Sequence, residues 1–363
     1  MDFRKEFQRI TAPKMEGKRF LQKARHALKK PYVQFGLLFV VMILVLILSM
    51  PQIKIIPVST KDSIAIVMIY AIASVGFCLL LGYSGLASLG TAGFIGIGSL
   101  ITFYGLKDWG VTMLPSLLII GVIAIVLGVV IGFVSLRIEG IYLAIMTLCM
   151  SEVIVRLLKA LEGGAIVITK SHISFFGLVV PDEAVFIIIA LVLVGLLIAT
   201  ANLINSPTGR AMQAMKSSTS AAQAMGISLM KYRLLAFVIA TLLATVSGFF
   251  YMIFIKAISM STSTVITLSM SLNILGAVII GGAKSLWGTL FGTFFVFGLQ
   301  TIVLKEIPFF ANNPDITVLF TGVLMIVIVM FFPGGFAEIV LRIKILIMKL
   351  IKKWRIRRYG IEE

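Results

Sequence analysis

Long apolar blocks without charge constrain the fold of this chain more than any other feature. The blocks 35–50, 64–81 and 184–204 each contain no Asp, Glu, Lys or Arg. A helix of roughly 18–20 such residues spans the hydrocarbon core of a bilayer. Hydrophobic residues make up 60% of the 363 residues and charged residues 13%, against about 45–50% and about 25% in soluble domains. These values exclude an ordinary soluble enzyme and predict an all-α polytopic membrane protein.

About ten apolar segments are predicted to form helices, some of them broken by glycine or re-entrant. They are 33–50, 63–83, 86–105, 114–136, 141–161, 184–204, 234–255, 264–283, 287–304 and 316–332. The longest polar interval between them, 205–233, is too short for a second soluble domain. We therefore predict one transmembrane domain, 33–337, between a basic arm at 1–32 and a basic tail at 338–363.

The distribution of charge predicts the orientation. The chain has 32 basic and 15 acidic residues, and 22 of the basic ones lie in 1–31, 205–233 and 338–363. Lys and Arg are retained on the cytoplasmic side of membranes. If all ten segments cross and the N-terminus is cytoplasmic, 24 basic residues face the cytoplasm and 6 face outward. Both termini are thus predicted to be cytoplasmic. Membrane lipid explains the basic arm better than nucleic acid does, so no nucleic-acid partner is expected.

The segment 82–98 is unusually rich in glycine, with six glycines in 17 residues. Each glycine weakens a helix by about 1 kcal/mol, and irregular backbone at membrane depth must be buried in protein or line a cavity. Gly-interrupted apolar segments point to transport sites. We predict that Ser84, Gly85, Ser88 and Gly90 line a translocation pathway. A second glycine-rich stretch covers 276–292. The alternative function for such residues is close packing of helices.

Two polar residues within apolar segments are further pathway candidates. Glu152 is the one carboxylate well inside such a segment, and Arg156 follows it at the i+4 spacing that favours an intrahelical ion pair. Asn273 is a lone amide in an apolar run. A structural pair for Glu152 and interhelical hydrogen bonding for Asn273 are the alternatives to a role in substrate passage.

The sequence contains no recognisable catalytic, metal or cofactor motif. Cys78 and Cys149 lie in separate apolar blocks, and no hydrolytic triad, zinc motif or G-x(4)-G-K-[ST] phosphate loop is present. We expect no catalytic residues, no metal and no cofactor bound by this chain.

The polar interval 205–233 is predicted to hold a short cytoplasmic helix. Ser217 or Ser218 can cap its N-terminus, and Gly226 can end it in the left-handed conformation. Ala222 and Met225 lie at i, i+3 spacing, which predicts a small apolar face that suits docking into a groove on a partner protein. Packing of this helix against its own bundle or against the lipid surface is the alternative.

Several motifs resemble those of one transporter family. The spacing Ala221-Ala222-x3-Gly226 is similar to the EAA-x3-G loop of ABC importer permeases, and the chain resembles the branched-chain amino acid permeases, closest to their LivM-type subunit, over about residues 60–340. The stretches that carry the likeness are 82–94, 136–148, 209–216, 221–227, 281–288 and 332–336. Carboxylates often precede the Ala-Ala pair in this family, whereas this chain has Ser217-Ser-Thr-Ser220 there.

The resemblance implies the permease subunit of an ATP-driven importer in the bacterial inner membrane, which translocates branched-chain or hydrophobic amino acids by alternating access. It implies as partners a second homologous permease, two ABC ATPases that use ATP and Mg²⁺, and an extracytoplasmic substrate-binding protein. The residues implied to couple the loop to the ATPases are Arg210, Lys216, Ala221, Ala222, Met225 and Gly226.

Three other functions remain open at this stage. Import of urea, nucleosides or sugars is an alternative within the family that the chain resembles, since relatives share the loop pattern. An ion-coupled secondary transporter would need a titratable site in the membrane, for which Glu152 is the candidate. A non-transporting assembly protein would show no solute flux with any partner.

Overall fold

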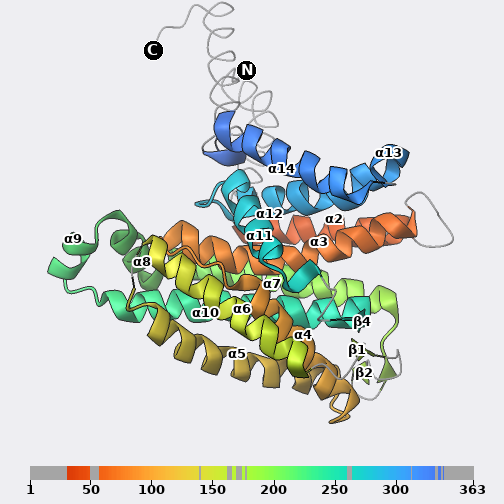
Figure 1. Cartoon of the computed structure of the whole chain (residues 1–363), viewed down its shortest axis with the longest axis horizontal. Helices are drawn as coiled ribbons and strands as arrows, with labels where there is room; N and C mark the ends of the chain where they lie inside the picture. The colour runs from red at the N-terminus through yellow and green to blue at the C-terminus, as the bar shows by residue number, and fades with distance from the viewer. Residues whose placement is uncertain are drawn as a thin grey trace, which may run out of the picture.

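The structure, a computed structural model of the chain, is a bundle of packed helices (Figure 1). It describes residues 31–49, 57–138, 140–161, 166–168, 174–175, 178–259, 264–311, 313–331, 334–336 and 338. The predicted basic arm and basic tail lie outside these residues, apart from 31, 32 and 338.

The helices follow one another along the chain with four short strands among them. In order, they are α2 (Pro31–Leu48), α3 (Val58–Phe77), η1 (Cys78–Tyr83), α4 (Thr91–Lys107), α5 (Met113–Ser135), α6 (Ile141–Leu161), α7 (Asp182–Asn205), α8 (Pro207–Ser217), α9 (Thr219–Ala224), α10 (Leu229–Ile255), η3 (Thr264–Ile266), α11 (Leu268–Gly281), α12 (Leu286–Thr293), η4 (Phe294–Val303), η5 (Leu304–Glu306), α13 (Pro308–Ala311) and α14 (Pro314–Phe331). Strand β1 (Ile166–Val167) pairs antiparallel with β4 (Ala257–Ile258), and β2 (Ser174–Phe175) pairs with β3 (Leu178–Val179).

Each of the ten predicted apolar segments overlaps a helix of this structure. Within the described part of the chain, six helical spans are long and apolar enough to cross a membrane, and three shorter apolar helices accompany them. The shorter ones are Gln34–Leu48, Leu268–Gly281 and Leu319–Phe331. The all-α, multi-pass architecture is therefore confirmed, whereas ten crossings and the orientation stay predictions.

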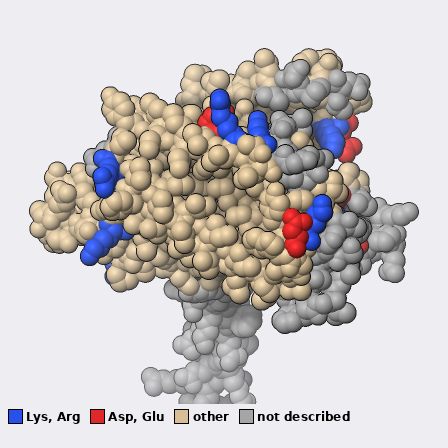
Figure 2. Space-filling view, turned by 60° about the horizontal axis from the view of Figure 1, so that its bottom comes forward, with Lys and Arg blue, Asp and Glu red and all other residues tan. Residues whose placement is uncertain are grey.

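Helix α3 lies at the centre of the bundle. Within the apolar 18-residue core of its span, Ser59–Tyr83, 83% of the residues are buried, whereas in that of α5 only 28% are buried. Helices α7, α10, α11, α12 and η4 surround α3. Helix α5 instead exposes a stripe of apolar side chains, including Leu118, Val122 and Val126. An apolar surface of this kind suits lipid rather than water, and Figure 2 shows one face of the molecule that is mostly uncharged.

Helices α4 and α10 touch through their backbones. A Cβ atom added to Gly248 would lie 2.0 Å from the carbonyl oxygen of Ile95, and one on Gly98 would lie 2.1 Å from that of Thr245. The Ser99 hydroxyl donates a hydrogen bond to the Gly248 carbonyl at 3.0 Å. Small residues permit this approach between membrane helices, and it fixes α4 against α10.

The two ends of the bundle differ in charge. The end that holds α8 and α9, here called the loop end, includes six basic residues and one carboxylate, Glu338, among the described side chains. The basic residues are Arg137, Arg210, Lys216, Lys231, Arg233 and Lys284. The opposite end, where β1 and β4 pair and α6 ends beside α4, has Lys61, Lys107, Lys159, Lys256 and Lys305 together with the carboxylates of Asp62, Asp108, Asp182, Glu183 and Glu306. At the left of Figure 2, where Figure 1 places α8 and α9, the charged side chains in view are basic.

The contact between α4 and α10 predicts the effect of one added methyl group. Gly248→Ala places a Cβ atom against the Ile95 carbonyl, and we expect destabilisation of about 1–3 kcal/mol because of overpacking. Gly195→Ala in α7 is the control, since nothing lies within 4 Å of its added Cβ atom. Thermal unfolding of both purified variants in detergent checks this. A Gly248→Ala protein as stable as Gly195→Ala would contradict the close approach.

Candidate functional site

The glycine-rich segment interrupts the helical structure at the loop end. Helix α3 continues into the π-helical turn η1, and the next helix, α4, begins only at Thr91. Between them, Ser84–Gly90 (here called the broken segment) is not helical. Along it, buried residues alternate with more exposed ones: Ser84, Ser88 and Gly90 are buried, and Gly85 is exposed. Gly85 has a φ of +75°, which glycine adopts without strain. The prediction of a Gly-broken helix is confirmed.

Hydroxyl groups from neighbouring helices satisfy the backbone of this region. The Leu89 amide donates a hydrogen bond to Thr147 Oγ1 at 3.0 Å. The first amides of α4, those of Ala92 and Gly93, donate to Ser271 and Ser151 at 3.0 and 3.1 Å. Amides at a helix start have no intrahelical partner, and none can be left unpaired inside a membrane. Sequence reasoning missed these three hydroxyl residues, whose only signal is their position in apolar runs.

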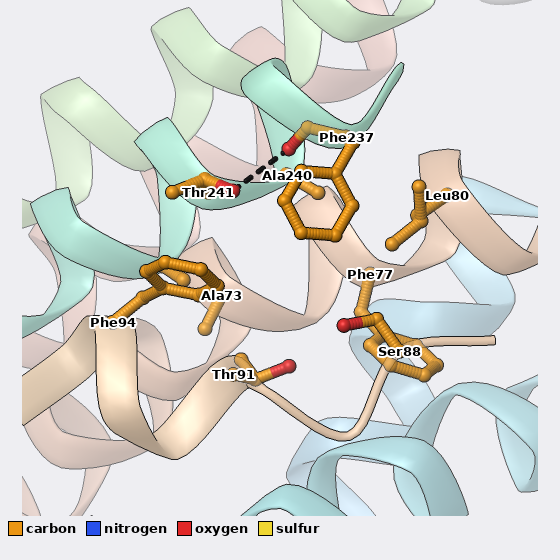
Figure 3. Close-up of a pocket in the computed structure, with 10 residues that line it drawn as sticks. Ala73, Phe77, Leu80, Ser88, Thr91, Phe94, Phe237, Ala240 and Thr241 are labelled. Carbon is orange, nitrogen blue, oxygen red and sulfur yellow. Dashed lines mark hydrogen bonds between the residues drawn. The ribbon is translucent and has the colours of Figure 1, made fainter. Parts of the chain in front are cut away.

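A small cavity adjoins the broken segment (Figure 3). Its volume is about 10 Å³, roughly the space of one water molecule. The rings of Phe94 and Phe237 meet edge to face at 6.2 Å, and the Ser88 and Thr91 hydroxyls border the same space. The lining residues are Ala73, Phe77, Leu80, Ser88, Thr91, Phe94, Phe237, Ala240, Thr241 and Ala244. This cavity is closed to any solute as large as an amino acid.

The second glycine-rich stretch packs directly against the first. It forms the turn between α11 and α12, and the Ala283 carbonyl lies so close to Gly82 that an added Cβ would be 1.8 Å away. The Tyr83 hydroxyl donates to the Lys284 carbonyl at 2.8 Å, and the Cys78 thiol donates to Ala283 at 3.2 Å. Two motifs about 200 residues apart in the sequence thus form one structural unit.

The predicted short helix in 205–233 is present as α9, preceded by α8. The Ser218 hydroxyl caps α9 by accepting a hydrogen bond from the Ala221 amide at 3.3 Å, and Gly226 follows its end with a φ of +80°. The prediction that Ala222 and Met225 share a face is wrong. Helix α9 ends at Ala224, so Met225 turns outward and is 82% exposed, whereas Ala222 is 3% exposed. Ala221, Ala224 and Met225 are thus the exposed apolar residues here.

Lys216 joins this loop to the membrane bundle. From the end of α8, its Nζ donates hydrogen bonds to the carbonyls of Leu81 and Gly82 at 2.9 and 2.7 Å. These carbonyls belong to η1, immediately before the broken segment. Burial and the neighbouring Lys284 lower the pKa of Lys216 below its ordinary value. Arg210, at the other end of α8, is exposed and donates to the Asn205 carbonyl at 3.3 Å.

The remaining predicted pathway residues lie away from the closed cavity. Glu152 and Arg156 form an ion pair at 3.5 Å on the outer face of α6, with side chains 52% and 79% exposed. Asn273 is half-buried in α11. Their roles in substrate passage stay predictions. Among the described residues, no group of three His, Cys, Asp or Glu side chains is placed to hold a metal ion.

The closed cavity predicts the reactivity of a cysteine placed in it. In a chain whose two native cysteines are replaced by alanine, Ser88→Cys is expected to resist a membrane-impermeant maleimide, because the cavity admits about one water molecule. Gln213→Cys on exposed α8 is the control, which the reagent should label fully. Mass spectrometry of both proteins checks this. Equal labelling would show that the cavity is open.

Comparison with known proteins identifies relatives over most of the chain. The family model described as "Branched-chain amino acid transport system / permease component" matches residues 59–329. The high-affinity branched-chain amino acid transport system permease protein LivM of Escherichia coli K12 is 30% identical over 331 residues, which cover 82% of this chain and 74% of the relative. LivM of Salmonella typhimurium LT2 is 28% identical over 307 residues, 76% and 69% of the two chains. No solved structure matches.

Proposed function

Because this chain belongs to the family of permease components of branched-chain amino acid transport systems, we propose that it translocates branched-chain or other hydrophobic amino acids in an ATP-driven importer. The observation that supports this most directly is the bond between the loop residue Lys216 and the carbonyls of Leu81 and Gly82. A loop that partner ATPases can reach is thereby attached to the segment that borders the closed cavity.

Movement can pass from the loop to the pathway through this attachment. Hydrogen bonds from an ammonium group to carbonyls are stronger than neutral ones. A shift of α8 therefore displaces the end of η1 and, with it, Ser84–Gly90. Displacement of this segment would move Ser88 away from Phe237 and open the cavity on that side, while the backbone contacts keep α4 fixed against α10. ATP hydrolysis and Mg²⁺ belong to the ATPases in this mechanism, and the permease contributes the pathway and the coupling.

The charge difference between the two ends supports the predicted orientation. Among the described side chains, six basic residues and one carboxylate lie at the loop end, whereas lysines and carboxylates mix at the other end. The positive-inside rule puts the loop end in the cytoplasm. With ten crossings, both termini lie on the same side as α8 and α9. The opposite end, with its short strands, faces the extracytoplasmic binding protein.

The outer face of α6 is the surface we assign to the second permease subunit. Helix α6 packs mainly on α4 and only slightly on α5, and Glu152 lies about 16 Å along it from Ile141 at 1.5 Å per residue. A charged pair at this depth costs several kcal/mol in contact with lipid. Protein or a water-filled interface must therefore cover Glu152 and Arg156. Two ATPases below and the second permease beside this face complete the importer.

Reconstitution tests the proposed function. Proteoliposomes that contain this chain, its copurifying permease and ATPases and the binding protein are expected to accumulate leucine only when ATP is supplied. ATP-driven uptake of urea, a nucleoside or a sugar without leucine would change the substrate class. Uptake that follows a proton gradient without ATP and disappears in Glu152→Gln would identify a secondary transporter. Absence of all flux would identify an assembly protein.

Substitution of Lys216 tests the coupling. Lys216→Gln removes the ammonium that bonds Leu81 and Gly82, and a charge-assisted bond contributes about 1.5–3 kcal/mol. We expect uptake to fall about tenfold or more while the ATPase subunits remain bound and hydrolyse ATP. Lys231→Gln, which removes an exposed charge at the same end, should keep normal uptake. Equal uptake in both variants would refute the coupling role.

The native cysteines allow a test of the α6 interface. Cys149 is exposed on α6 and Cys78 is buried, so a short bismaleimide can react only at α6. We expect this reagent to crosslink Cys149 of this chain to a cysteine introduced in the facing helix of the second permease, in native membranes. Exchange of Cys149 for serine abolishes the product, and Val122→Cys on exposed α5 in that background is the negative control. Crosslinking through α5 rather than α6 would contradict this arrangement.

A further inference from the structure

A second and much larger cavity opens at the loop end, outside the closed one. Its volume is about 380 Å³, within the range of about 300–1,000 Å³ that is typical of small-molecule sites. It is lined by Gly82, Tyr83, Gln213, Lys216, Ser217 and Lys284. We call it the basic cavity. Three separate parts of the chain form it: the end of η1, helix α8 and the turn between α11 and α12.

The lining has the chemistry of an anion site. Two lysines, Lys216 and Lys284, line the cavity, and none of the lining residues is acidic. Lys284 is exposed and forms no ion pair with any described residue. Lys216 uses two of its N–H groups on the carbonyls of Leu81 and Gly82, which leaves a third. Their mutual repulsion contributes to the lowered pKa of Lys216, and an anion between them would remove that cost.

Uncharged polar groups complete the site. The Gln213 amide supplies an acceptor and two donors beside the lysines. Such an acceptor can take a hydrogen bond from an ammonium group, while the lysines hold a carboxylate. The arrangement therefore fits a zwitterion better than a simple inorganic anion.

The position of the basic cavity relates it to the pathway. Gly82 and Tyr83 are part of its wall, and the chain continues directly into Ser84–Gly90, which borders the closed cavity. The Tyr83 hydroxyl donates a hydrogen bond to the Lys284 carbonyl at 2.8 Å, so the two glycine-rich stretches are joined in this wall. A solute released toward the loop end would meet this cavity next.

We infer that the basic cavity binds a carboxylate, and that in the working importer this is the carboxylate of the amino acid leaving toward the cytoplasm. The carboxylate chemistry rests on the lining residues alone. Its assignment to a transported amino acid rests on the proposed function.

A binding measurement on the importer complex, without the extracytoplasmic binding protein, tests whether the basic cavity binds a carboxylate. The complex of permease and ATPase subunits is placed in nanodiscs of phosphatidylcholine, and binding of radiolabelled leucine is measured by equilibrium dialysis. N-acetylleucine, which keeps the carboxylate, is expected to compete, and leucinamide, which lacks it, is not. Lys284→Gln should weaken binding about tenfold or more. Lys284→Arg should restore it, and Lys231→Gln should leave it unchanged.

Each other outcome overturns part of the inference. Equal affinity in Lys284→Gln, equal competition by leucinamide, or no leucine binding by the wild-type complex would refute the carboxylate site. The experiment is repeated with phosphatidylglycerol in the nanodiscs. Displacement of leucine by this lipid, together with lipid bound only when Lys284 is present, would refute the amino acid as resident ligand and assign the site to a lipid headgroup.

The same preparation separates this inference from the proposed function. If ATP and the binding protein drive leucine uptake while Lys284 variants bind leucine normally, the basic cavity is not an exit site and the function stands. If Lys284-dependent carboxylate binding occurs without ATP-driven uptake, the anion site stands and the proposed function fails.

Discussion

The backbone of residues 84–90 is the constraint on which the rest of the structure depends. The Ser84 amide still donates to the Leu79 carbonyl of η1 at 3.3 Å, but the helical pattern stops there, and the amides that are buried in the bundle beyond it need acceptors from the protein. The Thr147 hydroxyl of α6 accepts from the Leu89 amide within this segment, and the hydroxyls of Ser271 in α11 and Ser151 in α6 accept from the Ala92 and Gly93 amides directly after it, at the start of α4. The requirement to satisfy these amides therefore fixes two neighbouring helices around one irregular segment.

Close backbone contacts between helices hold the surroundings of the same segment in place. Glycines at positions 98 and 248 let α4 and α10 touch, and this brings Phe94 against Phe237. At the loop end, Gly82 allows the Ala283 carbonyl to approach. Because each of these contacts leaves no room for a methyl group, the parts are expected to move as rigid bodies against one another. That property suits a pathway that opens by displacement rather than by side-chain rotation alone.

Side chains at the surface of the bundle support the positions proposed for partner proteins. The apolar stripe of α5 needs only lipid, whereas the ion pair of Glu152 and Arg156 on α6 needs a polar neighbour at membrane depth. On the loop end, Met225 projects from the end of α9 and Lys216 reaches back into the bundle. One loop thus presents an apolar contact outward and a charged contact inward, which is the arrangement that the proposed coupling to ATPase subunits needs.

The sequence by itself determined the helical class, the positions of the segments, the break near residue 84 and the capped helix that ends before Gly226. These features follow from local composition, because apolar length, glycine content and capping residues act within a few positions of the chain. Tertiary structure alone decided which distant residues meet. Four features depend on how helices far apart in sequence pack: the contact of Gly82 with Ala283, the bond from Lys216 to Leu81, the burial of Ala222 and the exposure of Glu152. The periodicity of the sequence carries no information on which helices pack together.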